Sequence, residues 1–136
     1  MDFRQLLGRT PVEEIDARGA LANQQAGSVL IDVREPHEYE AGHAPGAELM
    51  PLGQLGSQLS ALPRDREVLF ICRSGNRSGL AAQIATAAGV KAKNVRGGMI
   101  AWNSAGLPRM TGAQTGSVDT RSRMNGNGDG RDEEAA

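Results

Sequence analysis

The chain has 136 residues, of which 39% are hydrophobic and 3% aromatic, and its formal charge is −1 at pH 7. This length suits one domain and leaves no room for two. A charge so close to zero argues against general binding to nucleic acids or anionic membranes, which both attract an excess of Lys and Arg. The longest clearly apolar run, residues 68–72, is far shorter than the roughly 20 residues of a membrane-spanning helix. We therefore expect no membrane segment.

Cysteine and histidine are scarce, which limits disulfide and metal chemistry. Cys72 is the only cysteine, and the two histidines are His37 and His43. One cysteine excludes an intrachain disulfide and an all-cysteine metal site, and two histidines are too few for a convincing zinc site. We therefore predict no metal and no cofactor. The lone thiol favours a cytoplasmic location, as does the absence of a basic and apolar secretory signal in residues 1–4.

The composition divides the chain into a lead-in, a domain and a tail. Residues 1–10 are a loose lead-in or a short helix, and residues 11–109 alternate strand-like and helix-like segments. Residues 110–136 hold five glycines, several Ser, Thr and Asn, and almost no large apolar side chains. Such a stretch cannot bury enough surface to offset its chain entropy, so we predict a disordered C-terminal tail.

The first half of the domain alternates short strands with short helices. Asp16 suits the N-cap of one helix, and Pro36 suits the first turn of another. Val29-Leu30-Ile31 is a continuous apolar run, which is typical of a strand buried on both faces. In chain order we expect a strand at residues 12–15, a helix at 17–25, a strand at 29–31, a helix at 37–41, a strand at 48–50 and a helix at 52–62.

The second half continues this alternation and contains the strongest strand signal. Leu80, Ile84 and Ala87 share one face of a helix, which predicts that this face is buried. Alternating strands and helices indicate an α/β fold in three layers, with a parallel sheet and helices on both of its faces. In chain order we expect a strand at residues 67–71, a helix at 78–88, a strand at 94–95 and a helix at 99–105.

The polar loop after the strongest strand carries the candidate chemistry. The strand runs into Cys72, and a helix begins a few residues later, where unpaired backbone N–H groups favour an anion. Gly75 allows the loop to direct several N–H groups at one point, and Arg73 and Arg77 add positive charge. These features favour the thiolate over the thiol. A buried structural cysteine is the alternative, but it has no need of such a loop.

The loop sequence, residues 72–78 or CRSGNRS, resembles the active-site loop of the rhodanese (thiosulfate sulfurtransferase) family. Residues 30–39 resemble the family's D-x-R … E-[FY] segment. Residues 42–47 resemble its G-H-I-P-G-A segment, with Ala44 where Ile is usual. Residues 97–108 resemble its closing segment. The likeness covers about residues 11–109, and four segments in the correct order make it specific.

The resemblance implies a single module with a five-stranded, mostly parallel sheet flanked by helices. It implies that the thiolate of Cys72 is the catalytic nucleophile, which takes the outer sulfur of thiosulfate or another persulfide-type donor. The resulting persulfide passes its sulfur to cyanide or a thiol, and a second cysteine to resolve it within the chain is absent. The acceptor must come from outside, and the sequence does not identify an acceptor protein. The expected donor-binding residues are Arg73, Ser74, Gly75, Asn76, Arg77 and Ser78.

Two charged residues near the second expected strand are candidate supporting residues. Asp32 ends that strand at the same edge of the sheet as the loop. It is expected either to orient Arg73 or Arg77 through an ion pair or to cap the next turn. Arg34 is four residues from Glu38, so a local ion pair between them is expected.

His43 and a pair of glycines complete the candidate site. His43 lies in a glycine-bounded turn and is expected to be a hydrogen-bonded scaffold residue, because a thiolate that has already formed needs no base. The pair Gly97-Gly98 is expected to let the chain pass close to the loop.

Two other functions fit parts of this pattern. A cysteine phosphatase also places a cysteine at a strand end and an arginine at a helix start, but its loop is one residue longer. Here four residues separate Cys72 from Arg77, which suits a sulfur atom better than a phosphate group. The main alternative is a non-catalytic binding module or a persulfide carrier, and the retained cysteine and arginines argue against a module without chemistry.

Overall fold

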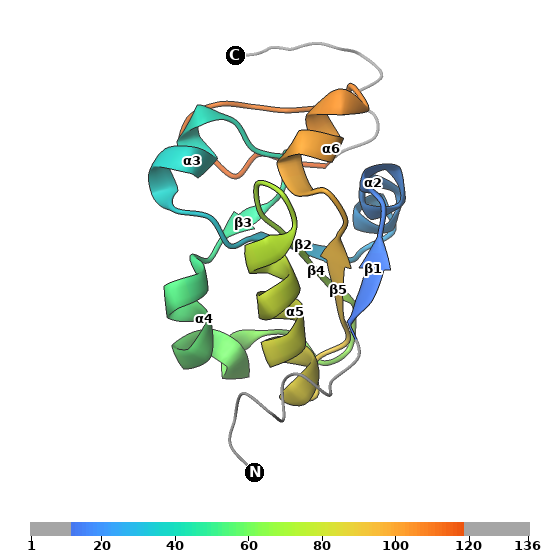
Figure 1. The fold of residues 1–136 in the computed structure, drawn as a ribbon, viewed down its shortest axis with the longest axis vertical. Helices are drawn as coiled ribbons and strands as arrows, with labels where there is room; N and C mark the ends of the chain where they lie inside the picture. Colours follow the sequence, from blue (N-terminus) through green and yellow to red (C-terminus); the bar gives the residue numbers. More distant parts are fainter. Residues whose placement is uncertain (1–11, 119–136) are drawn as a thin grey trace.

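The computed structural model describes residues 12–118, and a five-stranded sheet lies at the centre of this part of the chain (Figure 1). Its strands are β1 (Glu13–Ile15), β2 (Val29–Asp32), β3 (Glu48–Leu49), β4 (Val68–Ile71) and β5 (Ala92–Val95). They lie in the order β1-β5-β4-β2-β3, and every neighbouring pair is parallel. The α/β fold with a parallel sheet is therefore confirmed.

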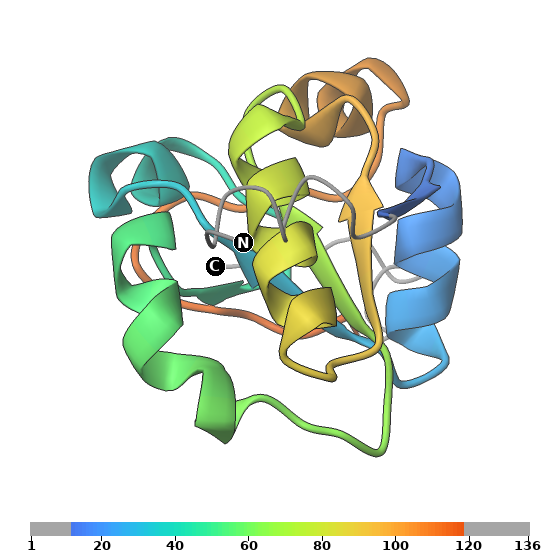
Figure 2. The same ribbon diagram turned by 60° about the horizontal axis from the view of Figure 1, so that its bottom comes forward.

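Helices cover both faces of the sheet, so the domain has three layers (Figure 2). They are α2 (Ala17–Gln25), α3 (Pro36–Ala41), α4 (Leu52–Gln58), the 3₁₀ turn η1 (Leu59–Ala61), α5 (Asn76–Ala87) and α6 (Gly98–Ser104). Leu69 and Ile71 of β4 pack with α2 and α6, whereas Val68 and Phe70 pack with α4 and α5. This alternation buries both faces of β4, as its continuous apolar sequence predicts. Within residues 12–118, no helix is long and apolar enough to cross a membrane.

Helix α5 turns a different face to the sheet from the predicted one. Leu80 is 41% exposed and Ala87 is also exposed, whereas Ile84 is partly buried and packs against the core. The prediction that all three line the buried face was therefore wrong for Leu80 and Ala87. The fully buried residues of α5 include Ala81, Ala82 and Ala85. Their small side chains let the helix lie close against β4 and β5, where a larger side chain would have to displace its neighbours.

The start of α2 agrees with the sequence prediction, whereas the helix expected over residues 52–62 ends differently. The Asp16 side chain accepts a hydrogen bond from the backbone N–H of Gly19 at 2.7 Å, which confirms the predicted N-cap of α2. The single helix expected over residues 52–62 is instead α4 followed by η1, which ends at Ala61. Such a tighter turn is common at the C-terminus of a helix.

The chain after α6 continues along the domain. The backbones of His43 and Met110 exchange hydrogen bonds of 2.8 and 2.9 Å, and Gly46 N donates to the Thr115 carbonyl at 2.7 Å. Residues 110–118, which the composition assigns to the tail, are thus hydrogen-bonded to the turn after α3. Composition does not reveal these contacts because main-chain hydrogen bonds need no apolar side chains. The expected lead-in and the rest of the tail, residues 119–136, lie outside the described residues.

Candidate functional site

The loop after β4 surrounds the sulfur of Cys72 with hydrogen-bond donors. Cys72 directly follows β4 and is only 1% exposed. Gly75 has a φ of 105°, in the left-handed region that favours glycine. Its N–H donates to Cys72 Sγ at 3.1 Å. The hydroxyl of Ser78, in the first turn of α5, lies 3.3 Å from the same sulfur. The loop thus forms a cradle at the carboxyl edge of the sheet, where ligands of open α/β sheets bind.

Burial and hydrogen bonding act in opposite directions on the Cys72 thiol. Burial disfavours the thiolate and by itself raises the pKa. Hydrogen bonds from the Ser78 hydroxyl and from the backbone N–H groups of Ser78, Gly75 and Ser74 lower it, and the net result is a pKa of Cys72 below its ordinary value. The side chains of Ser74 and Asn76 are exposed. The converging N–H groups expected from the loop are therefore present, and they favour negative charge on the sulfur.

The segment that leads into α6 lies against the loop. Met99 N donates to the Cys72 carbonyl at 2.8 Å, and Ile100 N donates to the Arg73 carbonyl at 3.0 Å. Gly98 has a φ of +55°, and a Cβ atom there would overlap the carbonyl oxygens of Cys72 and Arg73. The close approach expected of Gly97-Gly98 is therefore confirmed, because only glycine fits at Gly98.

Replacing Gly98 by alanine is expected to lower the free energy of unfolding by at least about 2 kcal/mol. A left-handed backbone costs an L-residue about 1–2 kcal/mol, and the overlap with backbone carbonyls adds to this. Urea denaturation measures the loss. The control is Gly53→Ala in α4, where nothing lies within 4 Å of the added Cβ and stability should rise by about 0.5–1 kcal/mol. A Gly98→Ala protein as stable as the wild type would contradict the close approach.

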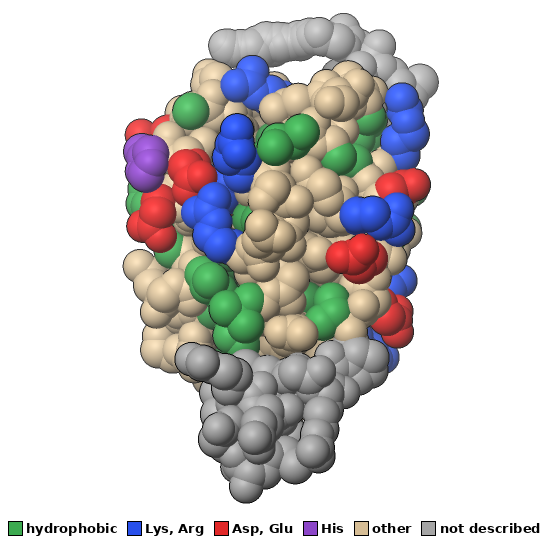
Figure 3. All heavy atoms as spheres, viewed as in Figure 1, with side chains coloured by type: hydrophobic (Ala, Val, Ile, Leu, Met, Phe, Trp, Pro, Cys, Tyr) green, Lys and Arg blue, Asp and Glu red, His purple; other side chains and the backbone are tan. Residues whose placement is uncertain are grey.

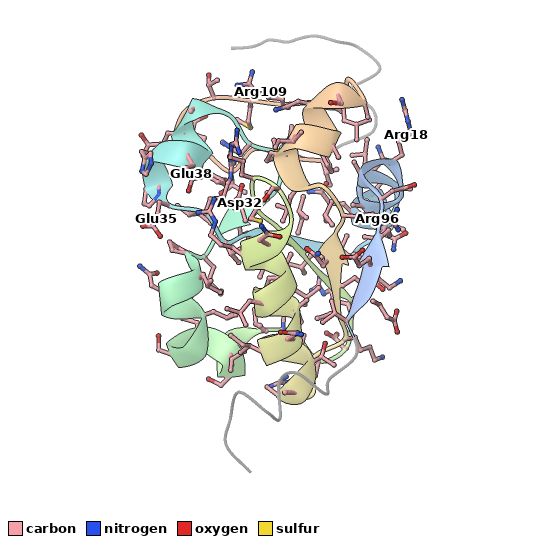
Figure 4. The ribbon with its side chains drawn as sticks, in the orientation of Figure 1. Arg18, Asp32, Glu35, Glu38, Arg96 and Arg109 are labelled. Carbon is pink, nitrogen blue, oxygen red and sulfur yellow. The ribbon has the colours of Figure 1, made fainter. Side chains whose placement is uncertain are left out.

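Asp32, at the end of β2 (Figure 4), forms a buried ion pair with Arg34. Asp32 is 0% and Arg34 6% exposed. Arg34 Nη2 lies 2.7 Å from Asp32 Oδ2, and the backbone N–H of Arg34 donates to Asp32 Oδ1 at 3.1 Å. Asp32 thus caps the next turn, which was one of its two expected roles. The other role was wrong, because within residues 12–118 Asp32 makes no hydrogen bond to Arg73 or Arg77.

The expected ion pair between Arg34 and Glu38 is not formed. Arg34 instead donates to the Gly42 carbonyl at 2.8 Å. Glu38 in α3 accepts two hydrogen bonds from Arg77 in α5, at 2.7 and 2.8 Å. These bonds lower the pKa of Glu38 to about 2. The pair ties the start of α5 to α3 and neutralises one of the two loop arginines. Its partners are 39 residues apart, so no local pattern could have predicted it.

A cavity of about 380 Å³ lies beside the loop, and Arg34, Glu38 and Ile100 of α6 are among its lining residues. Arg73 and Arg109 also line it. Among the described residues, no carboxylate lies within 4.0 Å of the Arg73 or Arg109 side chain. Figure 3 shows Lys and Arg side chains gathered on this face, and Figure 4 places Arg109 between α3 and α6. The cavity has the size of a small-molecule site and an excess of positive charge.

His43, which the sequence predicts to be a hydrogen-bonded scaffold residue, is fully buried. Its Nδ1 lies 2.8 Å from the Tyr39 carbonyl oxygen and its Nε2 lies 2.7 Å from that of Gln114. The ring also stacks on the ring of Tyr39, with centroids 3.6 Å apart. His43 therefore joins α3 to the segment after α6. In the part of the chain that the structure describes, no group of three or more His, Cys, Asp and Glu side chains could hold a metal ion.

Asn94 of β5 belongs to the site although no sequence motif pointed to it. It is 4% exposed. Its Oδ1 accepts a hydrogen bond from the Ser78 hydroxyl at 2.6 Å. Its Nδ2 donates to the Gly75 carbonyl at 3.2 Å and to the Glu14 carboxylate at 3.0 Å. The one available signal was its position near the carboxyl end of a strand, where sites in parallel sheets form.

Comparisons with known proteins agree with this geometry. Residues 13–105 match the family model of the rhodanese-like domain. A protein named "Sulfurtransferase" from Allochromatium vinosum is 38% identical over 101 residues, which cover 71% of this chain and 94% of that protein. "HTH-type transcriptional regulator Rv0324" from Mycobacterium tuberculosis is 38% identical over 113 residues, covering 81% of this chain but only 50% of the regulator. The crystal structure of a rhodanese-related protein from Thermoplasma volcanium aligns with a TM-score of 0.68 at 30% identity, covering 72% of this chain and 97% of that one.

Proposed function

The chain belongs to the rhodanese-like domain family, and on this premise we propose that it is a sulfurtransferase that carries sulfur on Cys72. The family and the sulfurtransferase relative support sulfur transfer as the general reaction. The observation that carries the assignment to Cys72 is the pair of hydrogen bonds to its buried sulfur, from the Gly75 N–H at 3.1 Å and from the Ser78 hydroxyl at 3.3 Å. Residues 11–109 act as one module on a small anionic donor such as thiosulfate or a persulfide.

In the first half-reaction, the Cys72 thiolate attacks the outer sulfur of thiosulfate. A new S–S bond forms on Cys72, and the S–S bond of thiosulfate breaks with its electron pair leaving on sulfite. Thiolate and thiosulfate dianion thus become persulfide anion and sulfite dianion, so charge is conserved. The N–H groups of the loop stabilise negative charge while it moves from the inner to the outer sulfur.

In the second half-reaction, cyanide or a thiolate attacks the outer sulfur of the persulfide. Thiocyanate or an alkyl persulfide leaves, and the electron pair of the broken S–S bond returns to Cys72 as the thiolate. Since Cys72 is the only cysteine, the acceptor comes from outside the chain, either as a small molecule or as a thiol on another protein. This order of steps predicts ping-pong kinetics.

The charges around the loop support an anionic donor. Arg73 and Arg109 line the neighbouring cavity without a carboxylate partner among the described residues. Two N–H groups of Arg77 bond the Glu38 carboxylate, which neutralises its charge, so we assign the first contact with the donor to Arg73 and the loop N–H groups. A lone reactive thiol is kept reduced in the cytoplasm, which is the location that we propose.

Two alternatives remain to be separated from an enzyme of this kind. A persulfide carrier or non-catalytic binding module would accept at most one sulfur per chain, whereas an enzyme turns over many donor molecules. A cysteine phosphatase would hydrolyse an aryl phosphate, which is disfavoured by the four-residue spacing between Cys72 and Arg77. Rates of thiosulfate–cyanide transfer and of aryl phosphate hydrolysis, measured on one preparation, distinguish the three.

Mass spectrometry of the intact protein after incubation with thiosulfate tests the proposed chemistry. We expect a gain of one sulfur atom, which cyanide removes as thiocyanate, because the donors around Cys72 stabilise the persulfide anion. Protein alkylated at Cys72 beforehand is the control and should gain no sulfur. A wild-type protein that gains none, or a gain that survives cyanide, would contradict the proposal.

A further inference from the structure

The hydroxyl of Ser78 lies between two acceptors but has only one hydrogen to donate. Its oxygen is 2.6 Å from Asn94 Oδ1 and 3.3 Å from Cys72 Sγ. Ser78 is 0%, Cys72 1% and Asn94 4% exposed, so bulk water has little access to any of the three side chains. At any moment the hydrogen therefore serves either the amide oxygen or the sulfur.

The orientation of the Asn94 amide is fixed by its other partners. Its nitrogen donates to the carboxylate of Glu14 and to the carbonyl of Gly75, which are both pure acceptors. Turning the amide over would place an oxygen against two acceptors and remove both hydrogen bonds. The group that faces Ser78 is therefore the amide oxygen, which can only accept.

We propose that Asn94 is a positioning residue that competes with Cys72 for the hydrogen of Ser78. When Cys72 is a thiol, Sγ–H donates to Ser78 Oγ, and Ser78 donates in turn to Asn94 Oδ1. When Cys72 is a thiolate, the Ser78 hydroxyl turns to the sulfur, and Asn94 Oδ1 loses its only donor among residues 12–118. A buried acceptor without a donor costs free energy, so Asn94 disfavours the thiolate.

If the proposed function holds, this competition also favours the persulfide form of Cys72 over the thiolate. In the persulfide the charge lies on the outer sulfur, so the inner sulfur no longer needs the Ser78 hydrogen, and the hydroxyl returns to Asn94. Asn94 therefore favours the state in which charge has left the inner sulfur. It also keeps the thiolate a stronger nucleophile, because nucleophilicity falls as the thiol pKa falls.

The charged groups around the site do not account for this effect. Glu14 is paired with Arg96 at 3.3 Å, and Arg77 with Glu38 at 2.7 Å. Replacing Asn94 removes a hydrogen bond to Glu14 but no charged side chain, and any effect on Cys72 that acts through Glu14 would persist in the Ser78→Ala background. The charged groups that face the site from its neighbouring elements are Glu14, Arg96, Arg77, Glu38, Asp32, Arg34 and Arg73.

A double-mutant cycle at Ser78 and Asn94 in the full chain tests the competition. In each variant, the ultraviolet absorbance of the Cys72 thiolate is measured as a function of pH. Cys72 is the only cysteine, so only one thiol contributes to the signal. Tyr39 is the only tyrosine, and burial raises its pKa, which moves its ionisation further from that of the thiol. Ser78→Ala should raise the pH midpoint of Cys72 ionisation by about 1–2 units, and Asn94→Leu should lower that midpoint by about 0.5–1 unit. In the Ser78→Ala background, Asn94→Leu should have no further effect. Asn94→Ala replaces the leucine variant if that protein does not fold.

The control is Asn23→Ala, which removes another Asn–Glu hydrogen bond, to Glu67 at 2.8 Å, in α2, and should leave the midpoint unchanged. An unchanged or raised midpoint in the Asn94 variants would overturn the proposal. A further shift in the Ser78→Ala background would also overturn it, because Asn94 would then act through the Gly75 carbonyl. The titration needs no turnover. A protein that transfers no sulfur but shows the expected midpoints would refute the proposed function and leave the competition standing.

Discussion

Replacing Cys72 by serine is expected to abolish sulfur transfer while the domain still folds. A serine hydroxyl is not ionised near neutral pH and cannot form a persulfide, so both half-reactions lose their nucleophile. The Gly75 N–H and the Ser78 hydroxyl, which surround the sulfur, remain available as partners for the new oxygen. Thiosulfate–cyanide transfer, measured as thiocyanate formed over time, should fall to the rate without protein.

The loss of sulfur transfer is evidence for the role of Cys72 only if the Cys72→Ser protein is folded. Its circular dichroism spectrum should match that of the wild type, and its free energy of unfolding should change by less than about 1.5 kcal/mol, the size of one net hydrogen bond. Transfer that persists in a folded Cys72→Ser protein would remove the basis for a persulfide on this residue.

Replacing Arg34 by alanine is expected to lower the free energy of unfolding by about 3–5 kcal/mol, the cost of leaving one partner of a buried ion pair without the other. Arg34 is 6% exposed, and its guanidinium bonds both oxygens of the fully buried Asp32 carboxylate. The substitution also leaves the Gly42 carbonyl without its donor. Urea denaturation, analysed for both midpoint and slope, measures the loss.

Arg77→Ala is the matched control, because it removes the same side chain from a partly exposed ion pair. The side chains of Arg77 and Glu38 are 37% and 21% exposed, and exposed pairs contribute about 0–1 kcal/mol. Arg77→Ala should therefore cost much less stability than Arg34→Ala. Equal losses in the two variants would mean that burial does not distinguish the pairs, and the structural role assigned to Asp32 and Arg34 would fail.

The loop that holds Cys72 was predictable because its signals are local. An apolar run, a polar loop with a glycine at its centre and a following helix are all contiguous in the sequence. The chain direction alone places Cys72 at the carboxyl edge of the sheet, and the helix start supplies N–H groups. The hydrogen bonds to the sulfur come from Gly75 and Ser78, both within this segment.

The ion pairs were not predictable because they depend on distances through space. Four-residue spacing favoured Arg34 with Glu38, yet Arg34 bonds Asp32, and Glu38 bonds Arg77 from another helix. Spacing along a helix predicts contacts only when both residues belong to it. Arg34 lies outside α3, which begins at Pro36.

The sequence by itself determined the α/β fold, the identity of the single thiol and the segment that surrounds it, because these depend on periodicity, composition and neighbours in the chain. The tertiary structure alone decided which of the two loop arginines lacks a carboxylate partner among residues 12–118, which face of α5 is buried, and that Asn94 reaches the Ser78 hydroxyl. The physical reason is that parallel strands join distant segments side by side. Contacts across the sheet edge therefore follow from packing and register, which no local pattern encodes.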